Sequence, residues 1–99
     1  MVNIVIPQAE IRAFCECHQI KKLALFGSVL RPDFAPNSDI DVLVEFEPGA
    51  VIGLRFITIQ DELSTLLGHT VDLNTPDFLS RHFRDRVLES AEIVYERAG

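Results

Sequence analysis

Two short apolar segments, separated by a loop with two prolines, constrain the fold more than any other part of the chain. They lie within residues 23–44, which read LALFGSVLRPDFAPNSDIDVLV. The first segment ends at Gly27-Ser28, and the second opens with Asp39 and Asp41. Side chains alternate along a strand, so the two carboxylates share one face of the second segment. The opposite face is apolar and predicts a core contribution from Ile40, Val42, Val44 and Phe46.

The paired carboxylates indicate a site for a cation. Asp39 and Asp41 repel each other, and burying both is costly unless a cation or hydrogen bonds offset their charge. Magnesium suits this role, because it prefers hard oxygen ligands and takes only one or two carboxylates besides substrate phosphates. Gly27-Ser28 lies upstream, where a glycine permits close backbone approach and free N–H groups favour an anion. The alternative is a solvated strand end, with Asp39 simply closing the loop.

This combination resembles the signature of the polymerase-beta-like nucleotidyltransferases. Gly27-Ser28 with Arg31, followed by Asp39-Ile40-Asp41 on the next strand, corresponds to that family's Gly-Ser and Asp-hydrophobic-Asp motifs. The resemblance extends over residues 20–96, and the short chain points to the minimal nucleotidyltransferase branch. Such proteins are usually encoded beside a HEPN-domain protein and act as the antitoxin of a toxin–antitoxin pair.

The resemblance implies a role for each motif residue. Asp39 and Asp41, together with Asp72 on a later strand, would form the catalytic triad that binds two magnesium ions, and Asp72 could also act as general base. Gly27, Ser28 and Arg31 would bind the phosphates of the nucleotide, with ATP as the expected substrate. Alternatives from the residues alone are a surface strand position for Asp72, a plain turn at Gly27-Ser28, and a surface arginine at Arg31.

Hydrophobic periodicity and turn residues predict three helices and four strands. The helices are expected over 8–18, 51–67 and 77–90, and the strands over 22–27, 39–46, 70–74 and 92–96. The order α-β-β-α-β-α-β predicts an α/β fold of the two-layer α+β type, in a single domain over residues 1–99. The family resemblance implies the polymerase-beta-like nucleotidyltransferase fold. In that fold helices pack on a mixed sheet of about four strands, with the Gly-Ser and Asp-x-Asp strands adjacent.

Two of the predicted helices carry further expectations. Leu54 and Ile57 widen the apolar stripe of helix 51–67, which predicts burial on more than one side, although apolar surface there could instead bind a partner or a second copy of the chain. Helix 77–90 is expected to bury Phe78, Leu79, Phe83, Val87 and Leu88. Its basic residues Arg81, His82, Arg84 and Arg86 are interpreted as a solvated face rather than an anion site, because Asp77 and Asp85 can pair with Arg81.

Composition narrows the classes of partner and compartment. The net charge of −6 argues against broad nucleic-acid binding, which requires a cationic surface, but leaves a magnesium-bound nucleotide or a basic protein as ligands. No apolar run approaches the ~20 residues that span a membrane, and the N-terminal residues do not resemble a signal peptide, so we expect a cytoplasmic protein. Cys15 and Cys17 are expected to be ordinary reduced thiols.

Three functions are compatible with these residues. The first, implied by the resemblance, is a magnesium-dependent adenylyltransferase that transfers AMP from ATP to a tyrosine of a HEPN ribonuclease toxin. The second is a non-catalytic antitoxin that neutralises its partner by direct contact and tolerates loss of the aspartates. The third is an enzyme with a small-molecule acceptor, in which a second copy of the chain completes the site.

Overall fold

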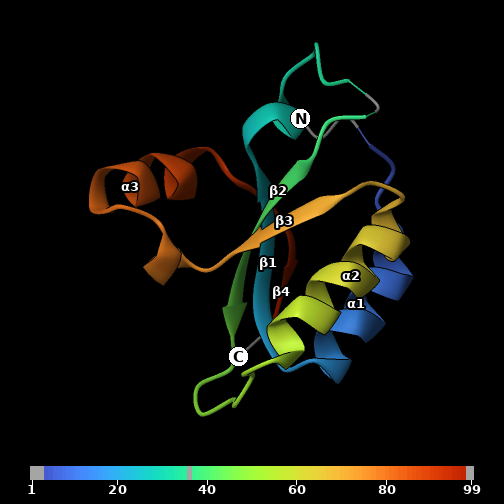
Figure 1. The fold of residues 1–99 in the computed structure, drawn as a ribbon, viewed down its shortest axis with the longest axis vertical. Coiled ribbons are helices and arrows are strands. Elements are labelled where there is room, and N and C mark those ends of the chain that lie inside the picture. The colour runs from blue at the N-terminus through green and yellow to red at the C-terminus, as the bar shows by residue number, and fades with distance from the viewer. Residues whose placement is uncertain (1–3, 36, 98–99) are drawn as a thin grey trace.

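The computed structural model describes residues 4–35 and 37–97, with only the backbone described at Phe78. Its elements follow the predicted order of helices and strands (Figure 1). The α-helices are α1 (Gln8–Cys17), α2 (Arg55–Leu67) and α3 (Arg81–Ser90), and two short 3-10 helices are η1 (Gly27–Leu30) and η2 (Pro76–Phe78). The strands are β1 (Ile20–Phe26), β2 (Ile40–Phe46), β3 (Val71–Asn74) and β4 (Glu92–Glu96).

The four strands form one mixed sheet in the order β3-β2-β1-β4. Strand β1 pairs antiparallel with both β2 and β4, whereas β2 and β3 run parallel. A parallel pair needs a crossover connection, which α2 provides between β2 and β3. The predicted mixed sheet is therefore confirmed, including the adjacency of the Gly-Ser and Asp-x-Asp strands.

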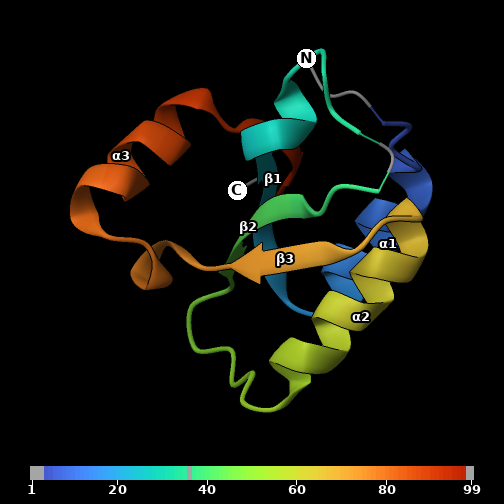
Figure 2. The same ribbon diagram turned by 45° about the horizontal axis from the view of Figure 1, so that its top comes forward.

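Helices α1 and α2 lie side by side against one face of the sheet (Figure 2). On α2, Ile59 and Leu63 recur one turn apart and are fully buried, as expected for an amphipathic helix. The predicted alternation on β2 is confirmed, since Ile40, Val42 and Val44 are all buried in this layer. The main core lies here and contains Ile11, Phe14, Cys15, Ile20, Leu23, Leu25, Val29, Ile40, Val42, Val44, Ile59, Leu63, Leu67, Val71 and Leu73.

The long helix begins at Arg55 rather than at residue 51, which corrects the predicted boundary. Gly49 and Gly53 have φ angles of 83° and 52°, and this left-handed backbone interrupts a right-handed helix. The predicted burial of Leu54 and Ile57 is also wrong, because these side chains are 89% and 61% exposed. Leu54 precedes the first residue of α2 and Ile57 lies in its first turn, and both side chains face solvent.

Helix α3 covers part of the opposite face of the sheet and buries less than the sequence predicts. It begins at Arg81 rather than at residue 77, because η2 intervenes and Ser80 caps the helix by accepting a hydrogen bond from the Phe83 N–H. Phe83 and Leu88 are 50% and 44% exposed, contrary to prediction. Of the four members of the predicted stripe whose side chains are described, only Val87 is buried, against Ala24, Phe26 and Leu43, with Leu79 partly buried beside them. The expectation for Phe78 falls on a side chain outside the described part.

The two thiols differ in environment but form no disulfide. Cys15 is buried in the main core and Cys17 is exposed on α1. Burial raises the pKa of the Cys15 thiol to about 12, so that it stays protonated and unreactive. Over the described ranges, no helix is both long enough and apolar enough to cross a membrane.

Candidate functional site

The Asp41 carboxylate lies directly against Gly27, which joins the two sequence motifs. Strand β1 ends at Phe26, and Phe26 pairs with Asp41 across the antiparallel ladder. The next residue, Gly27, has a φ of 75°, and a Cβ placed on it would overlap the Asp41 carboxylate, 3.3 Å from its Cγ. Only glycine fits both constraints. The missing side chain of Gly27 thus leaves room for the Asp41 carboxylate.

Asp72 lies beside Asp41 because β2 and β3 pair in parallel. The two residues are direct partners in the ladder, and both side chains face away from the main core. Helix α2 fixes this register from the outer edge of β3. Gln60 Oε1 accepts the Leu73 N–H at 2.9 Å, and Ser64 Oγ accepts the Val71 N–H at 3.0 Å. The backbone on both sides of Asp72 is therefore held by α2.

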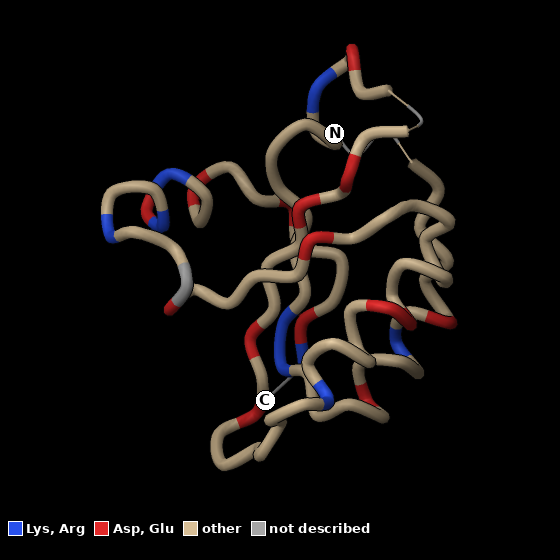
Figure 3. Tube along the Cα trace, viewed as in Figure 1, with Lys and Arg blue, Asp and Glu red and all other residues tan. Residues whose placement is uncertain are grey.

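The third predicted carboxylate, Asp39, lies one residue before β2 begins and is exposed. Burial raises the pKa of Asp41 above its ordinary value, and the neighbouring charges of Asp72 and then Asp39 raise it further. Figure 3 shows the acidic positions of β2 and β3 side by side near the centre of the molecule. The three predicted aspartates therefore form one electrostatic cluster.

This cluster fits a hard divalent cation that a substrate helps to bind. Its donors are carboxylate oxygens, and a positive ion would offset the burial and the neighbouring charges of Asp72 and Asp39 that raise the Asp41 pKa. Among the described residues, no three Asp, Glu, His or Cys side chains converge closely enough to hold a metal alone. Magnesium matches such an open site, because it retains waters and uses substrate phosphates as ligands.

A pocket of about 320 Å³ opens beside Asp41, between the end of β1 and α3. Gly27, Ser28 and Arg31 line it together with Asp41, so the structure brings four of the six predicted site residues to one cavity. Asp39 and Asp72 are not part of its lining. Gly27 and Ser28 open the 3-10 helix η1, whose first N–H groups have no acceptor within that helix. The remaining lining residues come from strand β1 and helix α3: Phe26, Phe83, Arg86, Val87 and Ser90.

The α3 residues of this pocket are the part of the site that the sequence interpretation missed. Arg86 was expected on a solvated helix face, and Phe83 was expected in the core. The available signal was the cluster of basic residues on one helix, but only the tertiary structure separates Arg86, which lines the pocket, from Arg81 and Arg84, which do not.

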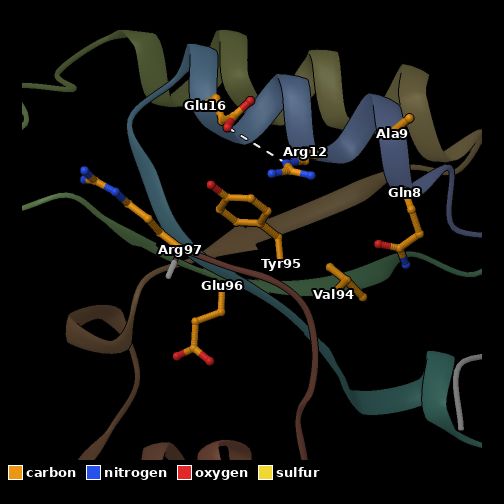
Figure 4. A pocket seen from close by; sticks show the side chains of 8 residues that line it. All are labelled: Gln8, Ala9, Arg12, Glu16, Val94, Tyr95, Glu96 and Arg97. Carbon is orange, nitrogen blue, oxygen red and sulfur yellow. Dashed lines mark ion pairs between the residues drawn. The ribbon is translucent and has the colours of Figure 1, made fainter. Parts of the chain in front are cut away.

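A larger pocket, of about 640 Å³, lies away from the carboxylates, between α1 and β4. Tyr95 lies beneath α1 there, with Arg12 and Glu16 above its ring and Arg97 beside it (Figure 4). Its arginines already have partners, since Arg12 pairs with Glu16 at 4.0 Å and Arg97 pairs with Glu47 at 2.6 Å. This cavity lacks the Gly-Ser and aspartate residues and is not the candidate catalytic site.

Comparison with known proteins agrees with the fold and the position of these motifs. A model of the family described as nucleotidyltransferase domain matches residues 10–94. This chain therefore belongs to the nucleotidyltransferase domain family. The match includes all six predicted site residues.

Relatives define the group within that family more closely. A candidate protein adenylyltransferase of Methanocaldococcus jannaschii is 45% identical over 81% of this chain and 80% of its own length. The protein adenylyltransferase MntA of Thermococcus cleftensis is 36% identical over 77% of this chain and 74% of its own. The predicted minimal nucleotidyltransferase family and the predicted enzyme class, the protein adenylyltransferases, are confirmed by these similarities.

Solved structures support the same grouping. A candidate minimal nucleotidyltransferase superposes with a TM-score of 0.70 at 32% identity, covering 85% of both chains. A toxin–antitoxin crystal structure with AMP-PNP gives a TM-score of 0.73 at 19% identity, covering 93% of this chain and 75% of the other. At that identity the second likeness establishes the fold alone. The predicted fold class is confirmed.

Proposed function

We propose that this chain is a magnesium-dependent adenylyltransferase that transfers AMP from ATP to a tyrosine of a HEPN-domain toxin and acts as its antitoxin. The observation that carries the chemistry is the Asp41 carboxylate, held against Gly27 and in register with Asp72. The protein substrate is suggested by the relatives, which are protein adenylyltransferases, and by the toxin–antitoxin structure that shares the fold. AMP-PNP in that structure supports an adenine nucleotide as donor.

In the proposed reaction each motif has a distinct task. Gly27, Ser28 and Arg31 bind the β- and γ-phosphates of ATP in the pocket between β1 and α3. Asp39, Asp41 and Asp72 would hold two magnesium ions. Bound magnesium would neutralise phosphate charge and stabilise the charge that develops on the transferred group.

The transfer itself is a displacement at the α-phosphorus. The tyrosine oxygen of the toxin forms the new P–O bond, the bond to the bridging oxygen breaks, and pyrophosphate leaves. Asp72 accepts the proton of the tyrosine hydroxyl. It is the most exposed carboxylate on the strands of the site, so an incoming protein side chain can reach it.

The test uses ATP labelled at the α-phosphate, magnesium and a HEPN-domain toxin from the same cell. Wild type is compared with Asp39→Asn/Asp41→Asn and with Glu45→Gln, which removes a carboxylate on the same strand that pairs with Lys22 at 4.0 Å. We expect label on the toxin with wild type and Glu45→Gln, and a loss of at least about 100-fold with the double variant. Mass spectrometry would then identify the modified tyrosine.

The same experiment can also contradict the proposed AMP transfer. A toxin that stays unlabelled with every variant, yet is inhibited equally by all of them, would establish a binding antitoxin in place of an enzyme. The exposed apolar residues Leu54 and Ile57, at the start of α2, favour this second candidate, because they offer a contact surface independent of the aspartates.

A further inference from the structure

Helix α3 places one arginine in the pocket beside Asp41. Arg86 lines that cavity opposite Gly27 and Ser28, and Val87 on the same helix turn anchors it by packing against the sheet. Arg81 and Arg84 belong to the same helix but do not line the cavity. None of the ion pairs between described residues includes Arg86. Within the described part of the chain, its guanidinium therefore has no carboxylate to displace before it binds a ligand.

The distribution of charge around the pocket indicates which ligand Arg86 would meet. The carboxylates lie at one side, with Asp41 on the lining and Asp39 and Asp72 beyond it. The cations Arg31 and Arg86 lie at the pocket itself. A nucleotide with its reacting phosphate at the carboxylates would therefore extend its phosphate tail toward the two arginines. Guanidinium groups bind phosphate oxygens through two parallel hydrogen bonds, which favours this orientation.

We propose that Arg86 is a nucleotide-binding residue that contacts the β- or γ-phosphate of the donor from α3, opposite the Gly27–Ser28 turn. This inference rests on the proposed function, since it assumes that a nucleoside triphosphate occupies the pocket. It makes α3 the second wall of the site, and it gives the helix a function besides covering Ala24, Phe26 and Leu43.

The experiment measures binding of ATP and of AMP, each with magnesium, by titration calorimetry. Arg86→Gln is compared with wild type, Arg86→Lys and Arg81→Gln, which removes the same charge from the same helix outside the pocket. We expect Arg86→Gln to weaken ATP about 10- to 100-fold and to leave AMP within about twofold, because AMP lacks the outer phosphates. Arg86→Lys should recover part of the ATP affinity, and Arg81→Gln should bind ATP as wild type does.

The outcomes separate this inference from the proposed function. If Arg86→Gln and Arg81→Gln bound ATP with the same affinity, the proposed role of Arg86 would be wrong, although the pocket would still bind the nucleotide. An equal loss of ATP and AMP affinity would also overturn it, since the contact would not be with the outer phosphates. Wild type that binds no ATP would overturn both the proposed function and the role of Arg86. Thermal unfolding of each variant confirms that the fold is retained.

Discussion

The two faces of the sheet differ in how much they bury. Among the described residues, the layer formed by α1, α2 and their face of the sheet has fifteen buried core residues, whereas the cluster beneath α3 has only four. The α1/α2 face supplies most of the hydrophobic stabilisation, which grows with the apolar area removed from water. The sparsely covered α3 face carries Asp41, Asp72 and the pocket that we propose binds the nucleotide.

The residues that stabilise the fold and the residues of the candidate site lie on opposite faces of the same strands. On β2, Ile40 and Val42 point into the main core while Asp41 between them faces the pocket. Under the proposed function, a nucleotide and a protein acceptor must reach the carboxylates together, which requires an open face. The small buried cluster beneath α3 leaves that face open, and the larger core on the opposite face compensates for the lost stabilisation.

The largest expected effect comes from equal truncations on the two sides. Leu63→Ala on α2 should lower the free energy of unfolding by about 2–5 kcal/mol, because a fully buried side chain leaves a cavity. Leu88→Ala on α3 should cost less than about 0.5 kcal/mol, because Leu88 is 44% exposed. Urea unfolding followed by circular dichroism measures both. Similar losses in the two variants would show that α3 is packed as tightly as α2.

A second pair of variants isolates the contact between Gly27 and Asp41. Gly27→Ala and Gly49→Ala both place alanine at a left-handed φ, 75° and 83°, and each should cost about 1–2 kcal/mol. Only at Gly27 does the added Cβ meet a neighbour, the Asp41 carboxylate. AMP transfer should therefore fall at least about 10-fold in Gly27→Ala and stay near wild type in Gly49→Ala. Equal activity in both would show that the position of Asp41 does not matter.

A third variant tests the link from α2 to the site. Gln60→Leu removes the acceptor of the Leu73 N–H and should lower stability by about 1–2 kcal/mol. It should also reduce transfer, because β3 and Asp72 lose one of their two supports from α2. Thr65→Val is the control, since the exposed Thr65 hydroxyl donates to the Asp61 carbonyl of its own helix and, among the described residues, has no hydrogen bond to β3. If Gln60→Leu transferred AMP as fast as Thr65→Val, the hydrogen bond from α2 would not be needed to position Asp72.

The smallest expected effect is a gain in stability. Burial and the charges of Asp72 and Asp39 raise the pKa of Asp41, so its ionised form is less favourable in the folded than in the unfolded chain. Without magnesium at pH 7, Asp41→Asn should be more stable than wild type by ~0.2–1 kcal/mol. The free energy of unfolding of wild type falls relative to that of Asp41→Asn as the pH rises through the folded-state pKa of Asp41, because the carboxyl then becomes charged in the folded chain. The difference should therefore vanish below about pH 4, where the carboxyl is protonated in both states. If the difference in the free energy of unfolding stayed the same from pH 7 to about pH 4, the gain would come from packing and not from the removed charge.

Much of the fold followed from local patterns in the sequence. The alternation of Ile40, Asp41 and Val42 predicted which face carries the carboxylate, because side-chain direction on a strand depends only on neighbouring residues. The predicted end of α2 at residue 67 is also correct, and Gly68, with a φ of 70°, follows it as the left-handed cap that glycine favours. The Gly-Ser and aspartate motifs placed Gly27 and Asp41 in one site, and the structure brings them into contact.

Other features depend on the tertiary arrangement and could not be predicted. The apolar stripe of α3 is visible in the sequence, but how much of the sheet lies within its reach is not, so Phe83 and Leu88 were wrongly expected to be buried. The start of α2 depends on the left-handed backbone at Gly53, which glycine permits but does not require. The place of Arg86 in the pocket depends on the path of η2 and the loop before α3.

The parallel pairing of β2 with β3 has a consequence for how the site is assembled. Strands β1 and β2 are close in sequence and can meet early in folding, which brings Gly27 to Asp41. Asp72 reaches Asp41 only after the whole of α2 has crossed the sheet, which is a non-local and slower step. A nascent chain that has not yet released β3 from the ribosome would therefore hold the glycine turn and two aspartates, Asp39 and Asp41, without the third carboxylate, Asp72. Under the proposed function, the chain should therefore gain AMP-transfer activity only after β3 has paired with β2.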